Sequence, residues 1–152
     1  MNNKVNITIN GFPVEIKKGQ TILEAAELEG IKIPTLCYHK DLCVAGNCRV
    51  CVVEVVGQKR LSAACATPCE DGMEILTNSL KVRNSRKHII ELLLAEHNAD
   101  CTKCYRNGNC ELQELASEYK IMTQDFIELA PLKNYTIDMY SPSIMKDDSK
   151  CI

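Results

Sequence analysis

The sequence predicts an α+β protein, with a small mixed sheet in the first half of the chain and a helical segment after it. Two strictly alternating apolar runs near the N-terminus predict paired strands, because successive strand side chains point to opposite faces. From Leu80 the apolar residues recur at helical spacing instead. The third observation is that most of the ten cysteines among 152 residues fall into two groups, one in each part.

The first two predicted strands form a hairpin. Apolar side chains alternate over residues 5–9 and again over residues 12–16. Asn10 and Gly11 lie between the two runs, and this pair favours a two-residue hairpin turn because both residues tolerate a positive φ angle. The two strands are therefore expected to run antiparallel.

A helix is expected next, beginning after Thr21. Thr21 and Glu24 have the spacing of a capping box, and the apolar residues that follow extend to Leu28. Gly30 is well placed to end the helix. A loop rich in metal-ligating side chains is expected over residues 33–47.

Three further strands complete the first predicted domain. Residues 50–56 form a nearly continuous apolar run that suits an interior strand, and residues 61–66 and 73–77 are typical of short flanking strands. The order ββαβββ predicts a mixed sheet crossed by one helix, the β-grasp layout, over residues 1–78.

The second predicted segment, residues 79–125, is helical. Ile90, Leu94 and His97 lie on one face of a helix that begins near Leu80, and basic residues occupy its first turns. These basic residues are Lys81, Arg83, Arg86 and Lys87. The short amphipathic helix that follows carries Leu112, Leu115, Ala116 and Tyr119 on one side. Residues 126–152 are expected to form an extended linker or tail.

Composition excludes several classes of partner and location. The net charge is −2 from 18 basic and 20 acidic residues, so no basic field for nucleic acid is expected. No apolar stretch has the length of a membrane span or the form of a signal peptide, so we expect no direct membrane insertion. Without an export signal the thiols are expected in the reducing cytoplasm, where cysteine groups usually bind metals or act in redox chemistry.

The first cysteine group has the spacing of a metal or cluster site. Ten residues separate Cys37 from Cys48, two separate Cys48 from Cys51, and thirteen separate Cys51 from Cys65. The close Cys48/Cys51 pair can present two thiolates from one turn. The small residues at 45–47 allow backbone N–H groups to approach anionic sulfur.

Two other cysteines leave alternatives open in this group. Cys43 with Cys48 and Cys51 reproduces the plant-type spacing C-x4-C-x2-C, so Cys43 competes with Cys37. Cys69 follows Cys65 by four residues and competes with it. If they are not ligands, Cys43 and Cys69 are expected to be small, partly buried hydrophobic residues.

The second group consists of Cys101, Cys104 and Cys110, which leave one position open on a four-iron cluster. His97 lies four residues before Cys101 at the end of the predicted helix, where its imidazole can face the loop that follows. Spacing alone also permits two tetrahedral zinc sites. The first would use Cys48, Cys51, Cys65 and Cys69, and the second would use His97, Cys101, Cys104 and Cys110.

The segments around the first cysteine group resemble a known 2Fe–2S domain, and they comprise residues 34–39, 45–54 and 63–68. This domain lies at the N-terminus of the large iron–sulfur subunit of complex I, of diiron hydrogenases and of NAD-linked formate dehydrogenases. The resemblance implies a 2Fe–2S cluster and places Cys43 at a non-ligand loop position. The implied ligands are Cys37, Cys48, Cys51 and Cys65.

The same family carries a His-x3-Cys-x2-Cys-x5-Cys segment that binds a 4Fe–4S cluster, and residues 107–113 also resemble its sequence. The implied ligands are His97, Cys101, Cys104 and Cys110. A string similar to residues 147–152 opens a further ferredoxin-like domain in that family. Because this chain ends one residue after Cys151, it is expected to be either a naturally short subunit or a fragment of a longer chain.

These features predict an electron-transfer module that is not catalytic alone. The sequence shows no nucleophile–base pair, phosphate loop or dinucleotide fingerprint, so NADH and flavin would bind a partner subunit. The resemblance implies that electrons pass between this partner and a hydrogenase, formate dehydrogenase or similar catalytic unit. The alternatives are a zinc-stabilised interaction domain and an iron–sulfur redox sensor.

Overall fold

The computed structural model describes residues 4–98, 100–122 and 136–150. The chain divides into two compact units, Met1–Ile89 and Ile90–Ile152. Among the described residues, no helix combines the length and the apolar character that a membrane crossing requires.

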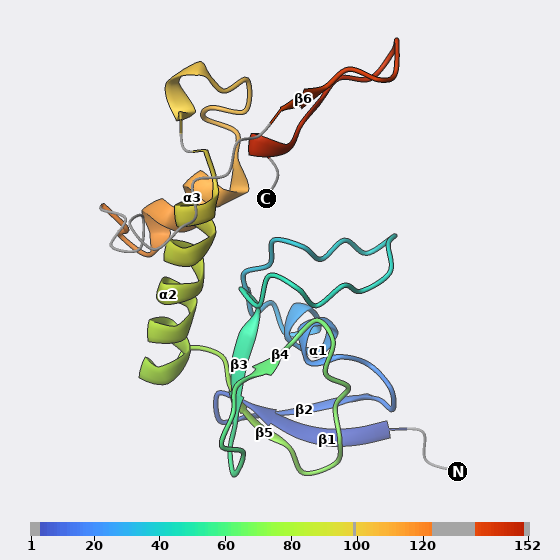
Figure 1. Ribbon diagram of the computed structural model, residues 1–152. Helices are drawn as coiled ribbons and strands as arrows, with labels where there is room; N and C mark the ends of the chain where they lie inside the picture. Colours follow the sequence, from blue (N-terminus) through green and yellow to red (C-terminus); the bar gives the residue numbers. More distant parts are fainter. Residues whose placement is uncertain (1–3, 99, 123–135, 151–152) are drawn as a thin grey trace. The chain divides into compact units, whose positions relative to one another are not determined.

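The first unit is built on a five-stranded mixed sheet (Figure 1). Its strands are β1 (Lys4–Ile9), β2 (Phe12–Lys17), β3 (Val52–Val55), β4 (Ser62–Ala63) and β5 (Glu74–Leu76). They lie in the order β2-β1-β5-β3-β4. The β1–β5 pair is parallel, and the other pairs are antiparallel. The predicted mixed sheet of an α+β protein is confirmed.

Local sequence signals place the first three elements. Asn10 and Gly11 adopt φ angles of 52° and 88°, and Ile9 pairs with Phe12 across the hairpin turn. Helix α1 (Ile22–Leu28) begins with the predicted capping box, in which the side chains of Thr21 and Glu24 each bond to the other residue's backbone N–H. This cap satisfies N–H groups that have no partner within the helix.

The core of the first unit is aliphatic and joins α1 to the sheet. The buried face of α1 packs with buried strand residues such as Ile9 and Ile75 in one cluster. The buried residues of α1 are Ile22, Leu23, Ala25 and Ala26. Cys51, Cys65 and Cys69 belong to the same cluster, so part of the cysteine-rich region lies inside the core.

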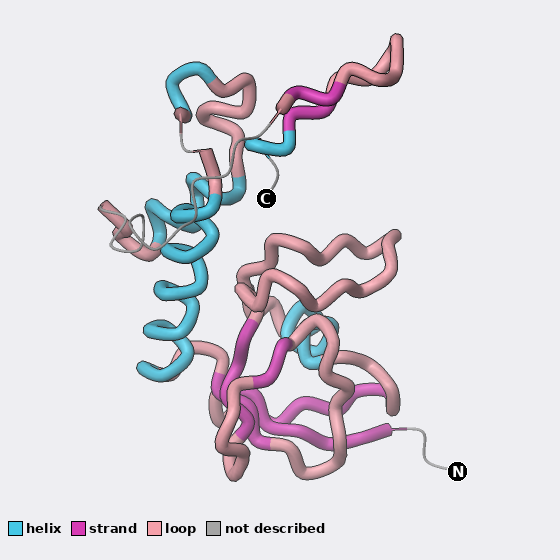
Figure 2. The backbone as a smooth tube through the Cα atoms, in the orientation of Figure 1, coloured by secondary structure: helices cyan, strands magenta, loops and turns pink. Residues whose placement is uncertain are grey.

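A long irregular segment connects α1 to β3 (Figure 2). Val50 is fully buried, as expected for a core residue, but β3 begins only at Val52. The preceding residues form a turn in which Arg49 takes a positive φ of 60°, and this conformation cannot continue a strand. The predicted strand over residues 50–56 is therefore shorter at its start.

The second unit contains the cysteine-rich helical segment. Helix α2 (Leu80–Glu96) crosses the division between the units, and the 3-10 turn η1 (Cys101–Lys103) and helix α3 (Glu111–Glu118) follow it. The two helices confirm the helical periodicity of this segment.

The described part of the tail contains an additional hairpin (Figure 2). Strand β6 (Ile137–Asp138) pairs antiparallel with β7 (Lys146–Asp147), and the 3-10 turn η2 (Asp148–Lys150) follows. Each strand has only two residues, too few for an alternating pattern to indicate it. Cys151 lies outside the described residues.

Candidate metal centres

Two cysteines of the first group meet because of strand register. Cys51 directly precedes β3, Cys65 follows β4, and the adjoining Val52 and Ala63 are register partners. The Sγ atoms of Cys51 and Cys65 lie 3.4 Å apart. Both residues are almost fully buried, with exposed fractions of 2% and 1%. The β3–β4 hairpin therefore delivers two thiols to one interior point.

The other two cysteines of this group lie in the loop before β3. The backbone N–H of Cys48 donates a hydrogen bond to the Sγ of Cys37 at 3.5 Å. Both residues are half-buried. The structure thus arranges the four predicted ligands as two pairs, one in the core and one nearer to solvent.

The loop backbone brings amide groups to sulfur, as its small residues predicted. Gly46 has a φ of 61°, and a Cβ at this position would lie 3.6 Å from the Cβ of Ala66. This left-handed conformation favours glycine and leads the chain back toward Cys37. N–H groups of Asn47 and Cys48 face the Cys37 sulfur as a result.

The pKa values of the thiols reflect this arrangement in the metal-free chain. Burial opposes ionisation of Cys37, but hydrogen bonds from Cys48 and Asn47 outweigh it and lower the pKa of Cys37. Burial raises the pKa of Cys48 and, together with the neighbouring Cys51 thiol, raises the pKa of Cys65 to about 12. The Cys65 thiol therefore favours the protonated state until a cation compensates the charge.

The two additional cysteines differ in exposure. Cys69 is buried in the core, and its backbone N–H donates to the carbonyl of Gln20. Burial, and then the charge of Glu24, raise the pKa of Cys69 to about 11. Cys43 is exposed beside the exposed Leu42, so its predicted partial burial is wrong. The loop holds Cys43 outside the buried core cluster.

The second cysteine group surrounds a cavity of about 320 Å³, an empty volume that includes space open to solvent. His97 contributes from the residue after the C-terminal end of α2, and Cys110 contributes from the residue before α3. The lining residues include His97, Cys101, Cys104 and Cys110, which are the four predicted ligands. The structure therefore brings all four to one hollow within the second unit.

Gln113 fixes the loop that carries Cys104 and Cys110. Its Oε1 accepts a hydrogen bond from the Gly108 N–H at 3.1 Å, and its Nε2 donates to the Oδ1 of Asn107 at 2.9 Å. The sequence did not reveal this role. Gln113 lies in the first turn of α3, three residues after Cys110, and this position could have indicated that its side chain bonds to the preceding loop.

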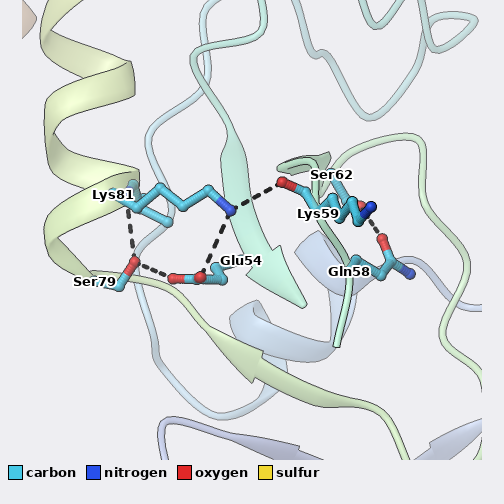
Figure 3. A network of polar contacts seen from close by, with 7 residues as sticks. Glu54, Gln58, Lys59, Ser62, Ser79 and Lys81 are labelled. Atoms are coloured by element: carbon cyan, nitrogen blue, oxygen red, sulfur yellow. Dashed lines mark hydrogen bonds and ion pairs between the residues drawn. The ribbon is translucent and has the colours of Figure 1, made fainter. Parts of the chain in front are cut away.

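A polar network holds the start of α2 against the sheet of the first unit (Figure 3). The Ser79 hydroxyl donates to Glu54 Oε2 at 2.5 Å and accepts a hydrogen bond from the Val82 N–H at 3.3 Å. The Lys81 ammonium lies 3.8 Å from Glu54 Oε1 and donates to the Lys59 carbonyl at 3.1 Å. Apart from the local bond between Val82 and Ser79, these contacts join residues distant in sequence, so periodicity did not predict them.

A mononuclear site is not formed in the described ranges. A zinc ion draws its ligand atoms to within about 2.3 Å of one point. Nowhere in residues 4–98, 100–122 and 136–150 do three His, Cys, Asp or Glu side chains converge so as to hold one metal ion. The donors of the second group instead line the cavity described above.

Comparison with known families assigns both regions. Residues 2–80 match a family described as a 2Fe-2S iron-sulfur cluster binding domain. Residues 86–125 match the NADH-ubiquinone oxidoreductase-G iron-sulfur binding region. Both matches agree with the resemblance that the cysteine motifs indicated.

Similar proteins are subunits of large redox enzymes. The NADP-reducing hydrogenase subunit HndD of Solidesulfovibrio fructosivorans is 44% identical over 153 residues, covering 97% of this chain and 26% of that protein. The NADH-ubiquinone oxidoreductase 75 kDa subunit of Reclinomonas americana is 46% identical over 115 residues, covering 76% of this chain and 17% of that protein. The chain thus spans about a quarter or less of these curated relatives.

A solved structure extends the likeness to the fold. A chain in the crystal structure of an NAD+-reducing NiFe-hydrogenase in the H2-reduced state matches with a TM-score of 0.85 and 34% sequence identity. The match covers 97% of this chain and 62% of that chain.

Proposed function

This chain belongs to the family of 2Fe–2S iron–sulfur cluster binding domains, here continued by the oxidoreductase-G type iron–sulfur region, and from that premise we propose which residues hold its clusters and which partners it serves. It is an iron–sulfur electron-transfer module of the hydrogenase and NADH dehydrogenase type.

The 2Fe–2S cluster is held by the two thiol pairs of the first unit. A two-iron cluster takes four cysteine thiolates, two on each iron. The 3.4 Å Cys51–Cys65 contact and the Cys48 N–H bond to Cys37 supply two such pairs. This sorting of four thiols into two pairs is the observation that carries the assignment. It favours Cys37 over the exposed Cys43 and Cys65 over Cys69.

The 4Fe–4S cluster is held by His97 and three cysteines of the second unit. The supporting observation is the cavity that these donors line, with Leu94 and Leu112 supplying apolar lining. The cysteine ligands are Cys101, Cys104 and Cys110. The Gln113 bonds keep the loop between the last two thiols in one conformation.

Each cluster supplies reversible one-electron storage when bound. The protein's part is to hold the donors, to exclude water and to compensate charge. Cys51 and Cys65 are shielded by the core, whereas Cys37 receives N–H groups that favour its anionic form. The described donors therefore fit the groups that the family binds.

The relatives support a proposal for the larger assembly. Those proteins are subunits of an NADP-reducing hydrogenase and of an NADH-ubiquinone oxidoreductase. We propose that this chain relays electrons between a subunit that binds flavin and NADH and a hydrogenase-like catalytic subunit, and that it has no turnover alone. Copurification under anaerobic conditions with such a flavoprotein would support this placement.

Anaerobic EPR spectroscopy of the reduced full chain tests the ligand assignment with matched variants. Cys37→Ser is expected to abolish the 2Fe–2S signal, while Cys43→Ser keeps it. His97→Ala is expected to remove or alter the 4Fe–4S signal, while His88→Ala, on the exposed face of α2, does not. A colourless protein with stoichiometric zinc would refute the function itself, and the opposite behaviour of the two cysteine variants would refute the ligand set.

A further inference from the structure

Arg86 is a buried cation whose side chain reaches the backbone beside a proposed ligand of the first cluster. Its side chain belongs to α2 and is only 3% exposed. The guanidinium Nη2 donates a hydrogen bond to the carbonyl oxygen of Val52 at 2.7 Å. Val52 is bonded directly to Cys51, one of the two core thiols. The positive charge is thus held at the backbone that carries a proposed ligand.

Sheet geometry explains why this carbonyl accepts a side-chain bond. On one side β3 pairs with β4 from Val52 onward, but on the other side β5 reaches β3 only at Glu54. Arg86 donates to the Val52 carbonyl at the level that β5 does not reach. A neutral amide could make the same bond, so the charge of Arg86 is not needed for this hydrogen bond itself.

A cluster at the four thiols would carry negative charge that a nearby cation compensates. Four thiolates around two irons leave the centre with excess negative charge, and reduction adds one more electron. Cys51 and Cys65 are almost fully buried, so water screens this charge weakly. A nearby positive charge lowers the free energy of the reduced form more than that of the oxidised form.

We propose that Arg86 raises the reduction potential of the 2Fe–2S centre by compensating the charge of its reduced state, in addition to holding the start of β3. The inference rests on the proposed function, because it needs the cluster at the four thiols. On this inference, a residue of α2 adjusts the reduction potential of a centre whose proposed ligands all lie earlier in the chain. One electron enters from the reductant, and no protein bond changes.

The test compares variants of residue 86 that keep or remove its charge, in the full chain with its iron–sulfur clusters bound. Arg86→Gln keeps a donor for the Val52 carbonyl, Arg86→Met keeps the volume, and Arg86→Lys keeps the charge. Arg83→Gln is the matched control, because Arg83 is exposed on the same helix and also donates to a backbone carbonyl, that of Asn78. The readout is an EPR-monitored titration with dithionite and redox mediators, together with iron content and thermal unfolding.

The two neutral variants are expected to lower the reduced-to-oxidised ratio of the 2Fe–2S centre about tenfold at a fixed potential, which corresponds to a fall of about 59 mV. Arg86→Lys and Arg83→Gln are expected to change the ratio less than about twofold, by less than about 18 mV. A merely structural role would change the unfolding temperature but leave the ratio unchanged.

Two outcomes overturn the inference. The first is a loaded Arg86→Gln or Arg86→Met protein that titrates like the wild type. The second is loss of the first cluster in both neutral variants, because Arg86 would then serve assembly rather than potential. Absence of a 2Fe–2S signal in the wild-type chain would instead contradict the proposed function.

Discussion

Cys69 illustrates how burial controls a thiol that we do not assign as a ligand. Its pKa is raised to about 11 by burial and by the charge of Glu24, whereas a thiol in the unfolded chain ionises near pH 9. The folded state therefore retains the proton of Cys69 at a pH where the unfolded state loses it. This contribution to stability is complete below pH 9 and is lost as the pH rises toward 11.

Cys69→Ala is accordingly expected to reduce the alkaline loss of stability. Between pH 8 and pH 10 the wild-type free energy of unfolding should fall by about 1 kcal/mol more than that of the variant. Urea unfolding of both proteins at the two pH values measures the difference. Equal slopes would show that the thiol is not held in the environment described, and loss of the 2Fe–2S signal would show that Cys69 is a ligand after all.

At the scale of elements, the first turn of α2 depends on one hydroxyl. Ser79 accepts from the Val82 N–H and donates to Glu54, so it caps the helix and ties it to β3. Ser79→Ala is expected to lower the free energy of unfolding by about 1 kcal/mol, as for other N-cap residues. Chemical denaturation checks the value. Ser85→Ala, inside the same helix, should leave stability unchanged or slightly raised, because alanine is the better helix former.

The elements that were predictable from sequence are those specified by neighbouring residues. Asn10 and Gly11 determine the hairpin, and Thr21 with Glu24 determines the start of α1, because these signals act within four residues. Hairpin β6–β7 gave no such signal. Its strands are short and its described strand residues are mostly exposed, so no alternation of burial marks them.

The candidate metal centres likewise have a part that the sequence predicted and a part that it did not. Cysteine spacing indicated both donor groups, but the pairing of Cys51 with Cys65 depends on the register of β3 and β4, which the sequence pattern does not contain. The contact between Arg86 and Val52 joins residues 34 positions apart, beyond the reach of any local pattern. Long-range side-chain contacts are the part that only the folded chain reveals.

At the scale of the whole molecule, the two sites belong to separate compact units. All four proposed ligands of the first group lie in Met1–Ile89, and all four proposed ligands of the second group lie in Ile90–Ile152. Each set of donors is thus completed within its own unit. Loading of one site is therefore expected to be independent of loading of the other.

Iron analysis of anaerobically reconstituted protein tests this independence. The wild-type chain should contain about six irons, Cys51→Ser about four, and Cys104→Ser about two. The remaining EPR signal in each variant should keep its wild-type line shape. If either single substitution reduced the iron content to zero, assembly of the two sites would be coupled and the prediction would be wrong.

The inward position of the Cys51–Cys65 pair also has a consequence for biogenesis. These two thiols lie within the aliphatic core, so iron and sulfide cannot be delivered to them through a closed domain. We therefore expect insertion to occur while the segment between α1 and β3 is still open, either during synthesis or in a transient opening. On this expectation, maturation of the proposed centre is coupled to the last stage of folding, and a bound cluster would favour the closed chain.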